Sequence, residues 1–476
     1  MALLPRLKIL SENDLQRVHD ASIKILESIG VVFESDEAIE IFKKHGVKVE
    51  GKKVFIPKKQ AEAAMAQAPE VFKYRARHDQ NTIICGEGFA PHPNIGPVFC
   101  QDMDKGRRPG TIRDFINFQK LSQASEYIKV TGATPVAPQD IFPVSARSLH
   151  MLYQSIKHTD KPLVGSCDEK RKVELQLDMV ETSMGQKGFL ENNCCIGVSC
   201  NPLSPLAYGT ETIETMLAYA RRRQPVFLLP CIMAGATGPM SLLGTIIQQN
   251  AEILAGASLI HLQSPGNPIV YCPASTAADM RTANVAYSAP EQFLINIPGL
   301  QMAIDFYRLP TRILTGMTSS KREDVQAGYE SMMNLLLGML GGGHLLLQCF
   351  GVLDSIMTTS YEKFVIDEEF YSKVLRFCQG LDTSDENYTI EILNEVGSKG
   401  SFLTHPDTMK KFRNHWLPIH GLASWETYNV WEKHGGQDIM VRANRKWKEI
   451  LAKSPETLID QELDRELLAI LDRAND

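Results

Sequence analysis

The sequence predicts an α/β fold, a (β/α)8 TIM barrel with an N-terminal α/β extension and a helical C-terminal region. Three observations carry this prediction. From about residue 126 short apolar runs alternate with amphipathic helical stretches, the runs are apolar on both faces, and eight of them can be counted. Strands buried on both faces and separated by helices indicate a parallel sheet. The region spans about 225 residues, which suits a barrel of eight such units.

The eight strand candidates are residues 127–133, 162–166, 194–200, 226–231, 258–263, 269–273, 312–316 and 344–350. The helix candidates between them are residues 144–158, 169–185, 208–223, 239–256, 290–308 and 323–340. The fifth and sixth strands lie too close together for a helix between them, so either that run is wrongly split or a helix is missing. An open doubly wound sheet is the alternative, but the glycine-rich turn that a dinucleotide would require after the first strand is absent.

The barrel candidate divides the chain into three parts. Residues 1–125 are predicted to form an extension that packs on the barrel, residues 126–350 the barrel itself, and residues 351–476 a helical C-terminal region. In the extension, Ser11 and Asp14 have the spacing of a helix start, and Gly30 stands where that helix should end.

Composition excludes several classes of protein. The 476 residues are 43% hydrophobic and 22% charged, with a net charge of −6, and they show no basic stripe of the kind that binds nucleic acid. No run of about 18 apolar residues suggests a membrane span. Ten cysteines without a CxxC pair suggest neither a disulfide scaffold nor a structural zinc site. We expect a cytoplasmic enzyme that needs no metal ion and binds neither membranes nor nucleic acid.

In a barrel the reactive groups lie past the carboxyl ends of the strands. There the sequence places side chains that are mostly polar, uncharged and partly aromatic, without the HExxH or GxSxG motif of common hydrolases. No lysine stands at a strand end for Schiff-base chemistry. Such a site suits a substrate that already carries its charge, and quaternary ammonium ions are held by aromatic faces.

The segment GMTSSK at residues 316–321 suggests a rival function. It could hold a phosphate after the seventh strand, as in a barrel lyase or aldolase. The other interpretation, a turn that caps the helix at 323–340, is favoured.

Several motifs together resemble one known family. They are DMDKGRRPGTIRDF (102–115), PGNPIVYCPASTAADMRTA (265–283), DVQAGYE (324–330), GVLDSIMTTSYEKFVIDEEF (351–370) and SFLTHPDTMKKFR (401–413). Over nearly its whole length the chain resembles the trimethylamine methyltransferase family of corrinoid-dependent methyltransferases. The resemblance implies a TIM barrel in an anaerobic methylotrophic pathway (methanogenesis or acetogenesis). It also implies a homo-oligomer and a cognate corrinoid protein that presents the cobalamin, so this chain binds no cofactor tightly itself.

One departure from the family's pattern bears on the substrate. The founding trimethylamine enzymes insert pyrrolysine, whereas this sequence holds only the twenty standard residues. The resemblance is therefore to members that demethylate quaternary amines, glycine betaine first, with proline betaine, carnitine and γ-butyrobetaine as alternatives. A quaternary amine leaves as a neutral tertiary amine, so neither an acid nor zinc is needed to expel it. A module that binds quaternary amines without methyl transfer is a further alternative.

Eight residues are candidates for binding the substrate, and none is assigned as catalytic. The aromatic side chains of Tyr271, Phe350 and Tyr361 could form a cage, and the amides of Gln263 and Gln348 could aim dipoles at the substrate. Asp279 and Arg281 could together bind a carboxylate or only fix a loop. Asp354 could neutralise the ammonium or cap a turn. The alternative for the aromatic and amide side chains is burial in the core.

Overall fold

Eight short parallel strands form the centre of the protein. The structure, a computed structural model, describes residues 4–282, 284–415 and 422–473. In chain order the strands are β6 (Ala90–Pro91), β9 (Thr131–Gly132), β10 (Leu163–Gly165), β11 (Ile196–Cys200), β13 (Val226–Leu228), β15 (Ile269–Tyr271), β18 (Arg312–Leu314) and β19 (Leu345–Leu347). They pair in two parallel sheets, β15-β13-β11-β10-β9 and β18-β19-β6.

Backbone contacts join the two sheets at both edges. Tyr271 at the end of β15 forms a parallel bridge with Thr311, and its N–H donates to the carbonyl of Pro310 at 3.0 Å. At the other edge, the N–H of Lys129 donates to the carbonyl of Pro91 in β6 at 2.9 Å. The eight strands therefore close into a ring, which agrees with the predicted fold class.

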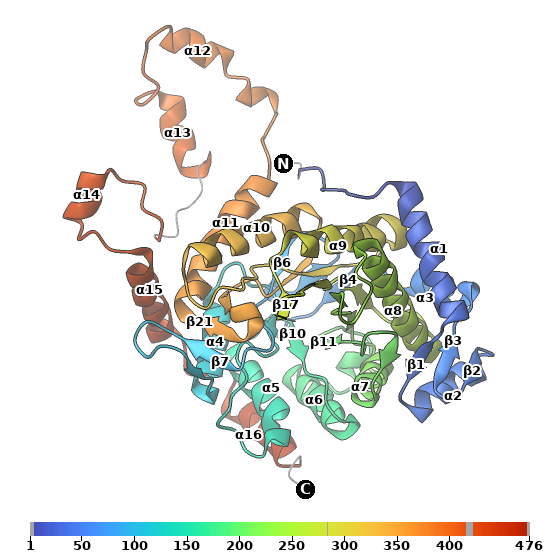
Figure 1. Cartoon of the computed structure of the whole chain (residues 1–476). Coiled ribbons are helices and arrows are strands. Elements are labelled where there is room, and N and C mark those ends of the chain that lie inside the picture. Colours follow the sequence, from blue (N-terminus) through green and yellow to red (C-terminus); the bar gives the residue numbers. More distant parts are fainter. Residues whose placement is uncertain (1–3, 283, 416–421, 474–476) are drawn as a thin grey trace.

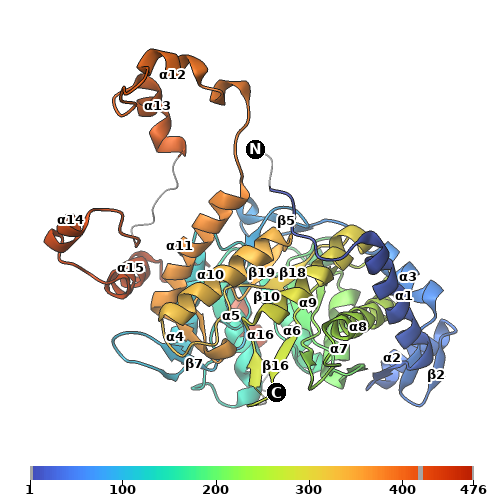
Figure 2. The ribbon, with the colours of Figure 1, turned by 45° about the horizontal axis from the view of Figure 1, so that its top comes forward.

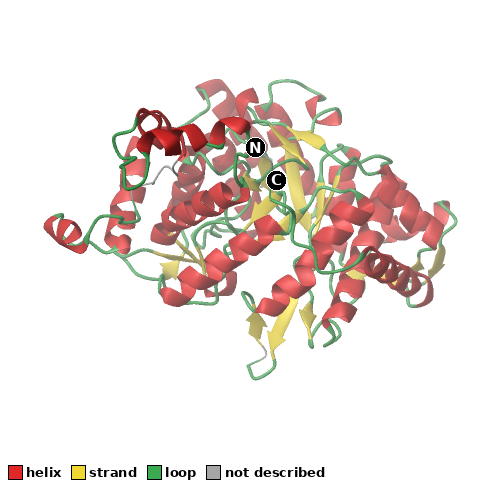
Figure 3. Ribbon diagram, turned by 90° about the horizontal axis from the view of Figure 1, so that it is seen from above, coloured by secondary structure: helices red, strands yellow, loops and turns green. Residues whose placement is uncertain are grey.

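A helix follows each strand of the ring. These helices are α4 (Ile112–Ala124), α5 (Arg147–His158), α6 (Lys170–Ser183), α7 (Thr210–Arg221), α8 (Leu242–Gln263), α9 (Pro290–Gln301), α10 (Val325–Leu340) and α11 (Tyr361–Cys378). Figure 1 shows them surrounding the strands in this order. The view in Figure 3 likewise places most strands inside the shell of helices.

The predicted strand at 258–263 is wrong, because these residues form the last turns of α8. The 22-residue α8 is covered by α1 (Glu12–Ser28) and α3 (Lys58–Gln67) as well as by the barrel, so its apolar residues are not confined to one face. An apolar run without helical periodicity cannot be distinguished from a strand by pattern alone.

The missing eighth strand is β6, which pairs with β19 from within the predicted extension. Its two residues are too few to show any periodicity. The division into residues 1–125, 126–350 and 351–476 stays a prediction, with β6 as a barrel strand that lies before its first boundary.

The N-terminal region covers the outer side of α8. Helix α1 begins with a capping box between Ser11 and Asp14, as predicted, and the chain turns at Gly30 with φ +76°. A small sheet follows, with strands in the order β12 (Ala207–Tyr208), β1 (Val31–Phe33), β3 (Lys53–Phe55) and β2 (Lys48–Glu50), flanked by α2 (Asp36–Lys44).

Two further sheets lie past the carboxyl ends of the barrel strands, because their strands directly follow those ends in the chain. One contains β14 (Met233–Ala234), β16 (Thr276–Asp279) and β17 (Asn284–Ala286). The other contains β20 (Val352–Leu353), β21 (Thr358–Ser360), β7 (Phe99–Gln101) and β8 (Arg108–Pro109). We call this end of the barrel the mouth.

The C-terminal region returns to the outside of the barrel. Helix α15 (Ile439–Lys453) packs on α11 and α4, and α16 (Gln461–Asp472) packs on α5 and α6. Between α11 and α15, helices α12 (Ile390–Val396), α13 (Pro406–His415) and α14 (Tyr428–Lys433) project away from the barrel, as Figure 2 shows. None of the helices in the described part of the chain has the length and apolarity needed to cross a bilayer.

Candidate active site

A cavity of about 470 Å³ opens at the mouth of the barrel. Residues just past six of the barrel strands line it, together with Tyr287 from the segment after β17; the six are Ile95, Thr134, Cys167, Asn201, Cys231 and Gln348. No Asp, Glu, Lys, Arg or His side chain is among the lining residues. A larger open hollow of about 700 Å³ lies between α6 and α16, outside the barrel and away from the strand ends.

A buried cation lies inside the barrel and is bonded to the wall of this cavity. Arg312 of β18 is fully buried, and its Nη1 donates to the hydroxyl of Ser199, a lining residue, at 2.5 Å. Its Nη2 donates to Nε2 of His92 at 2.6 Å, and the guanidinium lies 4.8 Å from the ring centre of Phe227. Within the described residues Arg312 has no carboxylate partner, which is unusual for a buried charge.

The hydrogen bonds fix the protonation of this group. Because an arginine can only donate, Nε2 of His92 accepts, and its Nδ1 carries the proton that it donates to the carbonyl of Pro93 at 2.8 Å. Burial, and secondly the charge of Arg312, hold the pKa of His92 well below its usual value. Burial lowers the pKa of Arg312 to about 10, so it stays charged at neutral pH. The Ser199 hydroxyl accepts from Arg312 and keeps its own proton to donate.

Three residues that line the cavity have left-handed backbone conformations although none is glycine. Their φ angles are +54° at Ala133, +60° at Gln348 and +81° at Ile356. This region is unfavourable for side chains with a Cβ and most unfavourable for a β-branched residue such as isoleucine. Strained backbone of this kind clusters at functional sites, where the surrounding structure holds it in place.

Of the eight candidate residues, Gln348 lies in the lining of the cavity. Both ends of its amide are occupied, because Oε1 accepts from the N–H of Ile95 at 3.2 Å and Nε2 donates to the carbonyl of Ile95 at 2.7 Å. Gln348 therefore fixes the loop after β6 through one donor and one acceptor of its amide, and its role in binding the substrate stays a prediction.

The predicted aromatic cage does not form from Tyr271 and Phe350. Tyr271 is fully buried in the layer between the barrel and its helices, where its hydroxyl donates to Oδ1 of Asn250 at 3.0 Å. Phe350 is also fully buried and packs against Phe364, with 5.7 Å between ring centres. Both are core side chains that point away from the cavity.

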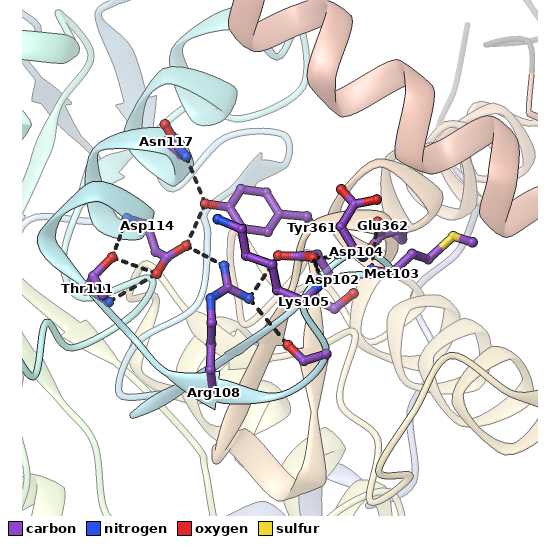
Figure 4. Close-up of polar contacts among 12 residues, drawn as sticks. Asp102, Met103, Asp104, Lys105, Arg108, Thr111, Asp114, Asn117, Tyr361 and Glu362 are labelled. Carbon is purple, nitrogen blue, oxygen red and sulfur yellow. Dashed lines mark hydrogen bonds and ion pairs between the residues drawn. The ribbon is translucent and has the colours of Figure 1, made fainter.

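Tyr361 is likewise a core residue, contrary to the cage prediction. Its ring is stacked between Phe118 at 4.4 Å and Trp447 at 4.5 Å. Its hydroxyl donates to Asp114 at 3.0 Å and accepts from Asn117 at 2.9 Å, as Figure 4 shows. Tyr361 therefore joins α11 to α4 and α15.

The remaining candidates also lie outside the cavity lining. Gln263 ends α8, so the prediction that it follows a strand is wrong. Arg281, with 88% of its side chain exposed, forms a two-point ion pair with Asp279 at 2.9 and 3.0 Å, which is the loop-fixing alternative. Asp354 lies within 3.4 Å of Nη2 of Arg107, and the two join the loop after β20 to the loop after β7.

The first motif of the sequence, 102–115, forms a buried polar cluster beside the mouth. Arg108 lies between Asp102 and Asp114, with 2.8 Å to each carboxylate, and Figure 4 shows this arrangement. Asp114 also closes a capping box with Thr111 at the start of α4. The cluster fixes the β7–β8 hairpin against α4, which explains the motif structurally.

The loop at 316–321 is occupied by a carboxylate of this chain. Glu330 of α10 accepts from the hydroxyl of Thr318 at 2.6 Å and from the N–H of Ser319 at 2.8 Å. Asp324 caps α10 through the N–H of Ala327. The donors that a phosphate would need are thus already engaged, which favours the interpretation as a helix-capping turn.

Among the described residues, no three His, Cys, Asp or Glu side chains are grouped to hold a metal ion. The expectation of a metal-free site stays a prediction.

The sequence analysis did not select the residues that supply the charge, the hydroxyl group and the aromatic ring at the cavity. Arg312 lies inside a predicted strand, and a charged residue in an otherwise apolar barrel strand is a signal that could have identified it. Ser199 lies near the end of the predicted strand 194–200, among the polar strand-end side chains, but no signal selects it as a candidate. Tyr287 lies in the loop before α9, where no pattern marks it.

Comparison with known proteins agrees with the resemblance of the motifs. The family described as trimethylamine methyltransferase (MTTB) matches residues 2–476. A glycine betaine methyltransferase from Desulfitobacterium hafniense is 36% identical over 98% of this chain and 97% of its own. A proline betaine:corrinoid methyltransferase from Eubacterium limosum is 32% identical over 86% of both chains. A trimethylamine methyltransferase from Desulfitobacterium hafniense is 27% identical over 98% of this chain and 94% of its own. The chain belongs to the trimethylamine methyltransferase family.

Proposed function

We propose that this protein transfers a methyl group from a quaternary amine to Co(I) of a corrinoid on a separate protein, and that the amine is glycine betaine. The 36% identity to a glycine betaine methyltransferase over nearly the whole chain supports the reaction class. The observation that carries the choice of substrate is the uncharged cavity bonded through Ser199 to the buried, unpaired Arg312.

This arrangement suits a zwitterion of small size. A carboxylate directed inward would accept a hydrogen bond from Ser199, whose hydroxyl is polarised by the guanidinium of Arg312. Coulomb attraction is strong in a site of low effective dielectric, so one fixed cation can orient the substrate. The quaternary nitrogen would then lie toward the mouth, away from Arg312, with one methyl group facing outward.

The reaction needs no proton transfer from this chain. The C–N bond breaks with its electron pair left on nitrogen, which becomes a neutral tertiary amine, and the acceptor cobalt supplies the pair for the new bond to carbon. A lining without acids or bases is consistent with this balance. The chain contributes orientation, which can lower a barrier by roughly 7–11 kcal/mol in well-positioned systems.

Tyr287 is the aromatic residue of the lining and the candidate to hold the ammonium. We expect Tyr287→Leu to weaken binding of glycine betaine by about 1–2 kcal/mol, because the cation–π attraction to its ring is lost. Titration calorimetry measures this, and Tyr287→Phe, which keeps the ring, should bind nearly as tightly as wild type. Unchanged affinity in Tyr287→Leu would exclude the residue from the site.

The assay for the proposed function mixes pure protein with chemically reduced cob(I)alamin and a panel of N-methyl compounds. Formation of methylcobalamin, followed by absorbance, is expected with glycine betaine and more weakly with proline betaine, carnitine or γ-butyrobetaine. Activity with trimethylamine and no quaternary amine would contradict the substrate. Tight binding of betaine without transfer would indicate a binding module. A higher melting temperature with phosphorylated ligands alone would indicate the lyase or aldolase.

We infer that the corrinoid protein docks at the mouth, because the cavity opens there, and that this chain holds no corrinoid tightly itself. We further propose that the enzyme is cytoplasmic and works as a homo-oligomer.

A further inference from the structure

Residues 381–437, which we call the arm, leave the body of the protein after α11 and return before α15. Its described residues are 381–415 and 422–437, and they include α12, α13 and α14. None of these three helices packs closely against another helix or strand of the described chain, and α12 and α14 contain no buried residue. Figures 1 and 2 both show the arm standing away from the barrel.

The arm exposes an unusual amount of apolar surface. Eleven of its large apolar side chains are at least 40% exposed: Leu381, Tyr388, Ile390, Leu393, Phe402, Leu403, Met409, Phe412, Trp425, Tyr428 and Val430. With about 150–250 Å² for each aromatic side chain and somewhat less for each aliphatic one, they expose on the order of 1,000 Å². Summed over the arm, this area is comparable to one side of a stable protein interface, about 800 Å².

The three helices of the arm are also short. They have 7, 10 and 6 residues in α12, α13 and α14. Isolated helices shorter than about 12–15 residues are marginal in water, and most helices in proteins are stabilised by packing. Because these helices do not pack closely on the described part of their own chain, we expect a surface from another molecule to stabilise them.

The position of the arm argues against the corrinoid protein as that molecule. Cys378, at the end of α11, accepts from the N–H of Leu4 at 3.2 Å, and Leu340, which ends α10 before β19 begins, accepts from the N–H of Leu7. The arm therefore starts at the end of the barrel opposite the mouth. In Figure 2 it extends upward, whereas β16 at the mouth lies at the lower edge.

The chemistry of the proposed function gives a second argument, which rests on that proposal. A methyl acceptor must dissociate between turnovers, and it would then return this apolar surface to water each time. Permanent complexes are the ones that bury large hydrophobic areas. A second copy of this chain can stay bound through the catalytic cycle.

We propose that the arm is the dimerisation element of this enzyme and packs on a second copy of the chain. The arm carries charges of both signs that have no ion-pair partner in the described structure, such as Glu391 on α12 and Lys410 on α13. Across a two-fold axis the same patch meets itself, so acidic and basic helices on one arm are self-complementary.

The test measures mass in solution and does not depend on catalysis. By light scattering after gel filtration and by sedimentation, the full-length protein is expected at two or more times its chain mass of 53.1 kDa. Leu393→Asp combined with Leu403→Asp should reduce it to the mass of a single chain. Both side chains are exposed on the single chain, so its barrel should fold normally by circular dichroism. Leu243→Asp on α8, whose leucine is 47% exposed, is the matched control and should leave the mass unchanged.

Hydrogen–deuterium exchange on the wild-type protein gives a readout that needs no variant. Amides of α12 and α13 should become protected as concentration rises through the micromolar range. A single-chain mass at all concentrations, or an oligomer that persists in the double variant, would overturn the proposal. So would an arm whose substitution abolishes binding of the corrinoid protein but leaves the mass unchanged. Methyl transfer to free cob(I)alamin, measured on the same samples, reports separately on the proposed function.

Discussion

Replacing Arg312 with methionine is expected to lower kcat/KM for glycine betaine about 100- to 1,000-fold. Removing one partner of a buried charged interaction costs about 2–5 kcal/mol, and each 1.4 kcal/mol is a factor of ten. In this protein the guanidinium acts through Ser199 on a cavity that has no charged lining residue, so no neighbouring group can replace it. Initial rates of methylcobalamin formation over a range of betaine concentrations measure the effect.

Choline separates binding of the carboxylate from general damage to the site. It carries the same trimethylammonium group but no carboxylate, so its affinity as a competing ligand should be nearly equal in wild type and Arg312→Met. Arg312→Lys keeps the charge but not the planar fork that reaches Ser199 and His92. Its kcat/KM for glycine betaine should therefore lie between the values for wild type and Arg312→Met. Equal losses of affinity for betaine and choline would remove Arg312 from recognition of the carboxylate.

The same substitution should change stability little. Arg312 is buried and has no ion-pair partner among the residues that the structure describes, and burial already lowers its pKa to about 10, so its charge is destabilising in the folded state. Methionine has a similar length and adapts to irregular space. The gain from removing an unpaired charge should offset the hydrogen bonds lost by Ser199 and His92. A large fall in melting temperature would show that Arg312 serves the fold.

The barrel was predictable from the sequence because parallel strands and their helices alternate over a long stretch. The failures have physical causes. The apolar run at 258–263 belongs to α8, which is buried on several sides and lacks the polar stripe of a surface helix. Strand β6 has two residues, and it is defined by its hydrogen bonds to β19 and not by any local pattern.

The site was less predictable because successive side chains of a strand point to opposite faces, and only every second one faces the cavity. In β15, Val270 points inward and Tyr271 points toward the helices, since neighbouring residues alternate. When both faces of a strand are apolar, the sequence does not show which residues point inward. Arg312 is the exception, because a charge in such a strand must have a special environment. The exposed arm was also missed, since helical periodicity does not reveal what a helix packs against.

Replacing Lys363 with methionine is expected to destabilise the protein by about 3–5 kcal/mol at pH 8, the usual effect of breaking a buried ion pair. Nζ of Lys363 lies 2.8 and 2.6 Å from the two carboxylate oxygens of Asp367 and donates to the hydroxyl of Ser331 at 2.8 Å. Asp367 also accepts from the N–H of Gly351 at 2.7 Å. Both charged side chains are almost completely buried, so the variant leaves a carboxylate with no cation.

The destabilisation caused by Lys363→Met should increase with pH. Burial raises the pKa of Asp367 to about 6 even with Lys363 beside it, and removing the lysine should raise it further. The unfolded carboxyl titrates near pH 3.9. Between pH values of about 3.9 and about 6, the Asp367 carboxyl binds a proton more often in the folded state than in the unfolded state. The free energy of unfolding therefore falls as pH rises through this window. The defect of Lys363→Met should therefore be smaller at pH 5 than at pH 8, by denaturant unfolding.

Lys43→Met on α2 is the matched control. Lys43 pairs with Glu40 at 2.9 Å, and both side chains are more than half exposed, so its loss should cost only about 0–1 kcal/mol. A defect in Lys363→Met no larger than in this control, or equal at both pH values, would contradict the account. The pair also bears on function, because Asp367 binds Gly351 at the start of the loop that ends in the strained Ile356 of the cavity. We therefore expect the variant to lose methyl transfer at temperatures where its barrel is still folded.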